Sequence, residues 1–409
     1  MSMNKVAIIG VGHTKFGRIQ DKGLMDLLCE ASLTAIEDSN TNDEDFDSVY
    51  VGSMSPEILN KTAGVASALV DRISLIPAAA DDIKNGPASG GSAIKAGFQA
   101  IASGMSDLVL VVGGEKMTHI TTPGYVTSNV ATLTHPEAER PHGVSLPSFA
   151  GLLARAYLEK YNAKLEWISD IAIKNHKNGA LNPNAHFQRT IEDFMKSAIE
   201  KGRGSWDNVY DFLGDDKTNP IIADPLRLFH ICPISDGAAA LVLCNAEKAK
   251  DYNDTPIMIS GIGQATDTHI VFEREEITTL KALKICSDQA YKMAKKTPKD
   301  IDVAELHDAF EILEAVQSED IGFFKKGEGA RAAHEGLTQI EGKIPINPSG
   351  GLKARGHPLG ATGVAQVVEL TWQLRGEAGK RQVDDAKTGI TCNFGGFGNN
   401  IISILVEKI

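Results

Sequence analysis

Cysteine is scarce in this sequence, and long apolar runs are missing. The five cysteines among 409 residues are odd in number and include no Cys-x-x-Cys pair, which argues against a disulfide framework and a zinc ribbon. The longest apolar runs, such as 108–112 and 401–406, fall far short of the roughly 20 residues that cross a bilayer. No signal-peptide pattern precedes the strand-like segment 5–9. We therefore expect no membrane span and a reducing, cytoplasmic location.

Basic residues are also in deficit. The sequence has 41 Lys and Arg against 53 Asp and Glu, a net charge of −12 that repels a phosphate backbone. We expect no nucleic-acid partner. Hydrophobic residues make up 42% of the chain, which is ample for a buried core, and the length suits two domain-sized units or one large duplicated fold.

Short runs rich in Val and Ile alternate with longer amphipathic stretches, a pattern typical of an α/β protein. The pattern returns about 250 residues downstream, where Ile257–Gly263 echoes Val6–Gly12 and Leu280–Ala294 echoes Leu24–Ala35. Three further pairs follow in the same order: Val303–Leu306 with Ser48–Val51, Gly360–Trp372 with Ser92–Ala102, and Ile390–Phe394 with Leu108–Val112. We therefore predict an internal duplication, with halves at 1–255 and 256–409.

The region from about 118 to 230 has no counterpart in the second half. It is rich in helix formers and punctuated by prolines. An insertion of this size between core elements is typical of a lid or substrate platform. A dimerisation element or a purely structural excursion is the alternative.

One stretch, Asn347–Gly363, surrounds a single histidine, His357, with glycines and prolines just before a predicted helix. Glycines permit close backbone approach, and a helix N-terminus supplies N–H donors to an anion. The stretch resembles the Gly-His-Pro-x-Gly-Ala-[Ser/Thr]-Gly motif of the thiolase superfamily. Further segments resemble the sterol-carrier-protein-x-like branch of that family: Leu306–Phe310, Lys174–Asn178 with Asn182–Ala185, Gly113–Met117 and Cys392–Gly398. The resemblance implies a duplicated five-layered α-β-α-β-α thiolase fold with a helical loop domain.

The resemblance also implies roles for single residues. His357 matches the histidine that activates the nucleophile and helps to hold the thioester oxygen, and His307 matches the other oxyanion-hole donor. Cys392 matches the cysteine that takes a proton from the α-carbon of an acyl-CoA or returns it, although an inert buried thiol is the alternative. The implied substrate contacts are Gly356, Phe394, Gly395 and Ser89.

One position departs from the family. Thiolases carry their acylated cysteine at a helix start, where the positive helix end favours a thiolate. The matching segment here is Lys84–Ile94, and the nucleophile's position is Pro87, which has neither a thiol nor a backbone N–H. A serine nucleophile at Ser89 or Ser92 is the less favoured alternative. The remaining cysteines, Cys29, Cys232, Cys244 and Cys286, are interpreted as core.

Two functions remain open from the sequence. The first is an enzyme that binds an acyl-CoA and makes or breaks a carbon–carbon bond next to the thioester, through an enolate and without an acyl-enzyme. The second is a degenerate thiolase subunit that supports a competent paralogue. The resemblance implies a homodimer or dimer of dimers, a small zinc-ribbon and OB-fold partner, and coenzyme A thioester as substrate with no further cofactor. No metal site is expected, because His135 and His142 have no third ligand at suitable spacing.

Ser235–Ala240 resembles the buried helix that closes the first half in this family, and we interpret it as a packing element.

Overall fold

The computed structural model describes residues 4–41, 46–119 and 123–409. Nine strands of this part of the chain form one mixed sheet in the order β3-β2-β4-β7-β1-β8-β11-β10-β9. The strands of the first half are β1 (Val6–His13), β2 (Ser48–Gly52), β3 (Ala79–Ile83), β4 (Leu108–Glu115) and β7 (Gly237–Asn245). Those of the second half are β8 (Ile257–Thr266), β9 (Val303–Glu305), β10 (Thr388–Gly395) and β11 (Asn400–Lys408). The α/β class is confirmed.

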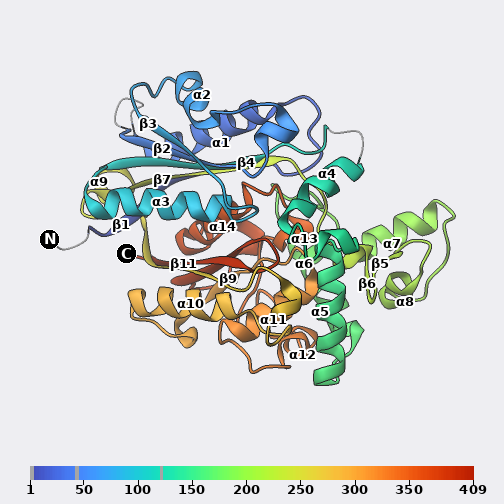
Figure 1. Ribbon diagram of the computed structural model, residues 1–409. Helices are drawn as coiled ribbons and strands as arrows, with labels where there is room; N and C mark the ends of the chain where they lie inside the picture. Colours follow the sequence, from blue (N-terminus) through green and yellow to red (C-terminus); the bar gives the residue numbers. More distant parts are fainter. Residues whose placement is uncertain (1–3, 42–45, 120–122) are drawn as a thin grey trace.

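The helices cover both faces of this sheet in layers (Figure 1). Helices α3 (Ser89–Ser103) and α14 (Thr362–Arg375) lie in the middle, between the strands of the two halves, and share one apolar core with them. Helices α1 (Leu24–Ser39) and α2 (Val65–Arg72) cover the outer face of the first half. Helices α10 (Lys281–Ala294) and α11 (Glu311–Asp320) cover the outer face of the second half. This arrangement of two halves places the starts of α3 and α14 close together. The division of the chain into halves at 1–255 and 256–409 stays a prediction.

The region predicted as an insertion is mostly helical. It contains α4 (Pro123–Val130), α5 (Leu146–Tyr161), α6 (Leu165–Ala180), α7 (Ile191–Glu200), α8 (Val209–Gly214) and the short strand pair β5 (Ile221–Ala223) and β6 (Leu226–Arg227). These elements lie along one side of the layered core, on the right in Figure 1. The remaining α-helices of the described residues are short: α9 (Ala249–Tyr252), α12 (Gly329–His334) and α13 (Gly351–Ala354).

The buried helix expected at Ser235–Ala240 is wrong, because strand β7 begins at Gly237. This strand pairs with β1 on one side and β4 on the other, and it is buried on both faces. Ala238 and Ala240 pack toward α1, whereas Ala239 packs toward α3. Alanines with a strong helical preference therefore lie in a central strand, because the close approach of two helix layers outweighs local propensity.

Among the described residues, no helix is both long and apolar enough to span a bilayer.

His176 on α6 is a buried histidine whose protonation should destabilise the fold. Its ring packs against Phe187, Phe194 and Phe229, and its Nδ1 lies 3.0 Å from the Arg189 carbonyl oxygen. Burial, with the Lys353 charge, lowers its pKa to about 3. In the unfolded chain the value is about 6.5. The stability that neutral His176 contributes is therefore present above about pH 6.5 and is lost as the pH falls.

We expect His176→Gln to flatten this dependence. Between pH 7 and pH 5 the free energy of unfolding of the variant should fall by about 2 kcal/mol less than that of the wild type, because one fewer proton is taken up on unfolding. Urea titrations at the two pH values measure the difference. His142→Gln, at an exposed position, should match the wild type; an equal effect of both variants would contradict this origin.

Candidate functional site

A largely apolar cavity of about 220 Å³ lies where the starts of α3 and α14 meet the inserted region. Its wall includes three residues that the sequence predicts for the site: Pro87, His307 and His357. The apolar lining comes from several elements: Met117, Val126, Val130, Leu146, Pro147, Ile231, Pro233, Ile234, Ala309, Phe310, Leu359 and Phe397. Helices α4 and α5 of the inserted region thus contribute wall residues, as a substrate platform would.

His357 is held at both its backbone and its ring. Its N–H donates to Ser235 Oγ at 3.3 Å, and its Nδ1 lies 2.7 Å from Thr362 Oγ1. Because the Thr362 hydroxyl donates to the Pro358 carbonyl oxygen at 3.0 Å, Nδ1 is best assigned as the donor to Thr362. Nε2 then carries a lone pair. Burial, with the Arg355 charge, lowers the pKa of His357 to about 3, so the ring is neutral.

His307 has the complementary tautomer. Its Nδ1 accepts the N–H of Phe394 at 3.4 Å, which leaves the proton on Nε2. Gln317 holds the backbone of His307 from both sides, accepting from its N–H and donating to its carbonyl oxygen, each at 2.9 Å. Burial lowers the pKa of His307 well below its ordinary value, with further contributions from His357 and Arg355. The two imidazole centroids lie 5.0 Å apart with perpendicular planes. One cavity therefore holds a neutral donor beside a neutral acceptor.

Pro87 lies two residues before α3, ahead of the N-cap residue Ala88, and not in the helix's first turn. Its carbonyl oxygen accepts a hydrogen bond from Asn393 at 3.3 Å. Ser89 is fully buried and does not line the cavity. Its hydroxyl accepts the N–H of Asn85 at 3.0 Å and donates to the Gly86 carbonyl oxygen at 2.7 Å. The Ser89 hydroxyl therefore closes the turn that leads into α3, and its hydrogen bonds to backbone groups do not favour a role as nucleophile.

Cys392 is fully buried on β10 and is not among the residues that line the cavity. Burial raises the pKa of its thiol well above the ordinary value, and Cys286 and Asp320 raise it further. Phe394, two residues along the same strand, stacks on His307 with ring centroids 5.0 Å apart and nearly parallel planes. Phe394 and Gly395 thus support the wall from behind, and the adjacent Gly396 lines it.

Glycines let the motif segments meet. Gly356 has φ 108°, and a Cβ there would lie 2.8 Å from Ser235 Oγ, so a side chain would displace the loop that carries His357. At Gly360 a Cβ would lie 2.5 Å from the carbonyl oxygens of Gly52 and Gly114. The Gly360 N–H donates to Glu115 Oε2 at 3.1 Å. The segment 113–117 is therefore a support for the histidine loop, while Gly356 itself does not line the cavity.

Sequence reasoning missed part of the wall. Cys232 was expected in the core; it is half-buried against the apolar core, and it also lines the cavity, which was not predicted. Its N–H donates to the Ala309 carbonyl oxygen at 3.0 Å, which ties the segment before β7 to the loop after His307. Burial raises the pKa of the Cys232 thiol to about 12, so it is not a ready thiolate. No local pattern around Cys232 or Ile234 distinguishes them from ordinary core residues.

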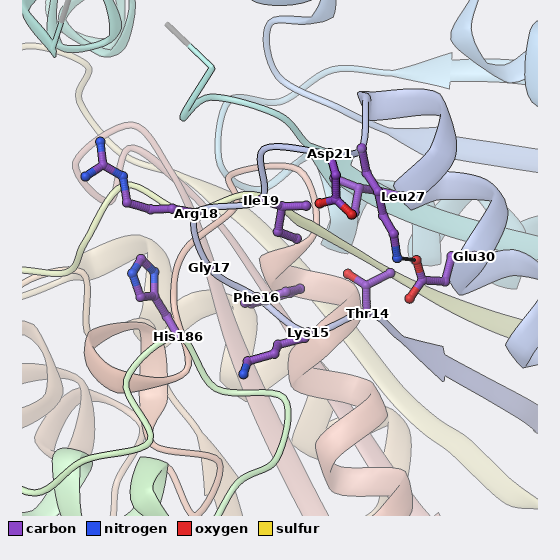
Figure 2. Close-up of a pocket in the computed structure, with 11 residues that line it drawn as sticks. Thr14, Lys15, Phe16, Gly17, Arg18, Ile19, Asp21, Leu27, Glu30 and His186 are labelled. Atoms are coloured by element: carbon purple, nitrogen blue, oxygen red, sulfur yellow. Dashed lines mark hydrogen bonds and ion pairs between the residues drawn. The ribbon is translucent and has the colours of Figure 1, made fainter. Parts of the chain in front are cut away.

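A second cavity, of about 520 Å³, lies beside segment 14–22 (Figure 2). Lys15, Arg18 and His186 are among the residues that line it. His186 Nδ1 lies 2.9 Å from Ser235 Oγ, the same hydroxyl that accepts the N–H of His357. Ser235 therefore lies between a histidine of one cavity and a histidine of the other.

Comparisons with known proteins agree with this geometry. Residues 6–247 match a family model described as the thiolase N-terminal domain, and residues 263–408 match one described as thiolase C-terminal domain-like. An acetyl-CoA acetyltransferase of Methanothermobacter thermautotrophicus is 43% identical over 398 residues, which cover 97% of each chain. Sterol carrier protein 2 of Bos taurus is 31% identical over 98% of this chain and 72% of its own.

A solved structure titled "Ltp2-ChsH2(DUF35) aldolase" has the same fold. The superposition has a TM-score of 0.79 at 23% identity and covers 100% of this chain and 99% of the other.

Proposed function

The chain belongs to the thiolase superfamily, and from that premise we propose that it forms and protonates the enolate of an acyl-CoA without becoming acylated. The reaction class is the making or breaking of a carbon–carbon bond next to a thioester. The histidine pair carries the proposal. A thioester oxygen near His307 would accept the Nε2–H, while the lone pair on His357 Nε2 would take the α-proton.

The two imidazoles act on opposite charges in this scheme. As the α-carbon gives its proton to His357, negative charge moves onto the thioester oxygen, where the His307 N–H stabilises it. His357 becomes an imidazolium, and its Nδ1–H stays bonded to Thr362. Protonation of the enolate reverses the transfer. In the cleavage direction His357 would first take the proton of the substrate's β-hydroxyl group. The carbon–carbon bond then breaks to give a carbonyl product and the enolate, and the enolate takes that proton back from His357 at its α-carbon.

Pro87 explains why this route avoids an acyl-enzyme. A thioester carbonyl that faces the start of α3 meets a ring that offers neither a nucleophile nor an N–H. Ser89 is occupied by its turn, and the Cys232 thiol has a pKa of about 12. The cavity volume is below the about 300–1,000 Å³ of typical ligand pockets, which suits a thioester with a short acyl group rather than a whole coenzyme A.

Hydrogen–deuterium exchange at the α-carbon tests the proposal directly. Purified protein incubated with acetyl-CoA or propionyl-CoA in D₂O should catalyse deuterium uptake at the α-carbon, seen by NMR. Intact-protein mass spectrometry of the same sample should show no added acyl mass. Exchange that depends on a covalent adduct, or complete lack of exchange with every short acyl-CoA tried, would contradict the proposal.

Cys392 gives a second, separate prediction. The sequence resemblance assigns the proton transfer to this thiol, whereas its burial outside the cavity lining and its raised pKa favour His357. We expect Cys392→Ala to retain exchange within about 10-fold of the wild type, since only packing behind His307 changes. A loss of about 10³-fold in the exchange rate, at unchanged stability, would show that Cys392 and not His357 is the general base.

A degenerate subunit is the second candidate function, and Pro87 is the observation that favours it. In this case the chain would show no exchange alone and would gain it only with a second protein. The aldolase structure with the same fold carries the name of a second component, ChsH2(DUF35), beside Ltp2. The small zinc-ribbon and OB-fold protein that the family resemblance implies is the partner we would add first. Exchange by the chain alone would then be compared with exchange by the mixed complex.

A further inference from the structure

A buried ion pair joins the two segments that carry the histidines. Glu305 ends β9, two residues before His307, and Arg355 lies two residues before His357. Arg355 Nη1 donates to Glu305 Oε2 at 3.0 Å. The exposed fraction is 1% for the Arg355 side chain and 0% for that of Glu305. The pair thus connects equivalent positions on both histidine segments.

Ser349 completes the connection. Its N–H and its hydroxyl both donate to Glu305, at 3.1 Å and 2.8 Å, and its Oγ accepts from Arg355 Nη1 at 3.3 Å. The cluster lies at the start of the segment that leads through α13 to Gly356. The Arg355 side chain therefore ties the loop that carries His357 to the end of β9, the strand that precedes His307.

The positive member of the pair is the less compensated one. Nε and Nη2 of Arg355 have no hydrogen-bond partner within the described part of the chain. Burial raises the pKa of Glu305 to about 7, so its negative charge is costly in this place. The Arg355 charge lowers the pKa of both His307 and His357. Burial is the larger cause at both rings, and at His307 the neighbouring His357 also outweighs Arg355, so the guanidinium is an additional positive charge that both imidazoles share.

We propose that Arg355 is a positioning residue of the site, which holds the His357 loop to β9 through Glu305 and supplies a fixed positive charge to the histidine pair. The charge adds to the burial that keeps both rings neutral before reaction, so that one can donate and the other can accept. It also stabilises negative charge that develops on a substrate oxygen between them. This inference rests on the proposed enolate chemistry for its kinetic effect, although its electrostatic part does not depend on any substrate.

Other charged or titratable groups share this interior. Those coupled to Arg355 or Glu305 are His13 on β1, His307 after β9, His357 before α14, and Glu369 on α14. Arg381 neutralises Glu369 through three contacts of 2.9 to 3.0 Å. Arg381 acts on His13 but is not a cause of the shifts at His307 or His357. The Glu369 and Arg381 pair is therefore a matched control.

The test combines imidazole NMR with α-proton exchange on the full chain. In ¹⁵N-histidine-labelled protein, Arg355→Gln should raise the protonation midpoints of His307 and His357 by about one pH unit or more. Glu305→Gln, which keeps the cation, should leave them unchanged or lower. With acetyl-CoA in D₂O, Arg355→Gln should slow exchange by at least 10-fold, whereas E369Q/R381Q should not.

A merely structural role predicts a different pattern, because loosened packing hydrates the histidines in Arg355→Gln and Glu305→Gln alike. Midpoints that rise equally in these two variants, or in neither, would overturn the inference. If Arg355→Gln does not fold, E305Q/R355Q removes both charges and should still raise the midpoints. Should the wild type lack exchange altogether, the proposed function fails, while the NMR comparison still decides the role of Arg355.

Discussion

Replacing His357 by Gln should lower α-proton exchange of acetyl-CoA by about 10³-fold, the range expected for loss of a positioned general base. Gln keeps polar atoms of similar reach, but it has no basic nitrogen to accept the proton. His357 Nδ1 is tied to Thr362 and its backbone to Ser235, so its Nε2 is the atom free to act in the cavity. The rate would be read by ¹H NMR in D₂O at fixed substrate concentration.

The matched control is His142→Gln at an exposed position, which should exchange at the wild-type rate. Thr362→Val offers a graded test. It keeps the imidazole but removes the acceptor of Nδ1–H, so both tautomers become populated and we expect a loss of about 10-fold in the exchange rate.

The exchange rate of the wild type should also stay constant from pH 8 to pH 6, because His357 with a pKa of about 3 stays neutral there. Unchanged exchange in His357→Gln would remove this residue from the mechanism.

The sequence could predict those parts of the fold that local pattern determines. Along 6–112 and 257–394, the spacing of apolar residues shows which side of each strand or helix is buried, because buried positions recur with the period of that element. The strands and helices predicted from this spacing are present. The histidine loop was also predictable, because Gly356 and Gly360 permit approaches that no other residue allows. The failure at Ser235–Ala240 has the opposite cause: its alanines are small to fit between two helix layers, a requirement set by distant segments.

Within the candidate site, the limit was side-chain direction. Cys392 and Phe394 share one face of β10, and both pack into the core behind His307 rather than line the cavity. Cys232 looked like a core residue, yet it lines the wall because the segment before β7 crosses over Ala309. Motif spacing can identify which segments meet. It does not reveal which side of a short loop faces the empty volume, since that depends on residues more than 70 positions away.

Pro87→Cys is the variant with the largest expected gain. The new thiol would lie on the wall that holds His357, just ahead of the N-terminus of α3, where the helix dipole favours a thiolate. The substitution also returns a backbone N–H, although Pro87 lies two residues before the helix and its carbonyl must keep the bond from Asn393. We expect the variant, incubated with acetyl-CoA, to gain one acetyl group, where the wild type gains none.

Pro87→Ala separates the two introduced features, because it supplies the N–H without the thiol and should stay unmodified. The double variant P87C/H357Q should acylate at least 10²-fold more slowly, since the basic Nε2 of His357 is then missing and cannot take the thiol proton. Peptide mapping must place the label at position 87. A label on Cys232 would show instead that this thiol is reactive despite its raised pKa. If Pro87→Cys remains unlabelled while it folds and still exchanges α-protons, the carbonyl carbon of the bound thioester does not face the start of α3, and the placement of substrate between His307 and His357 would have to be reversed.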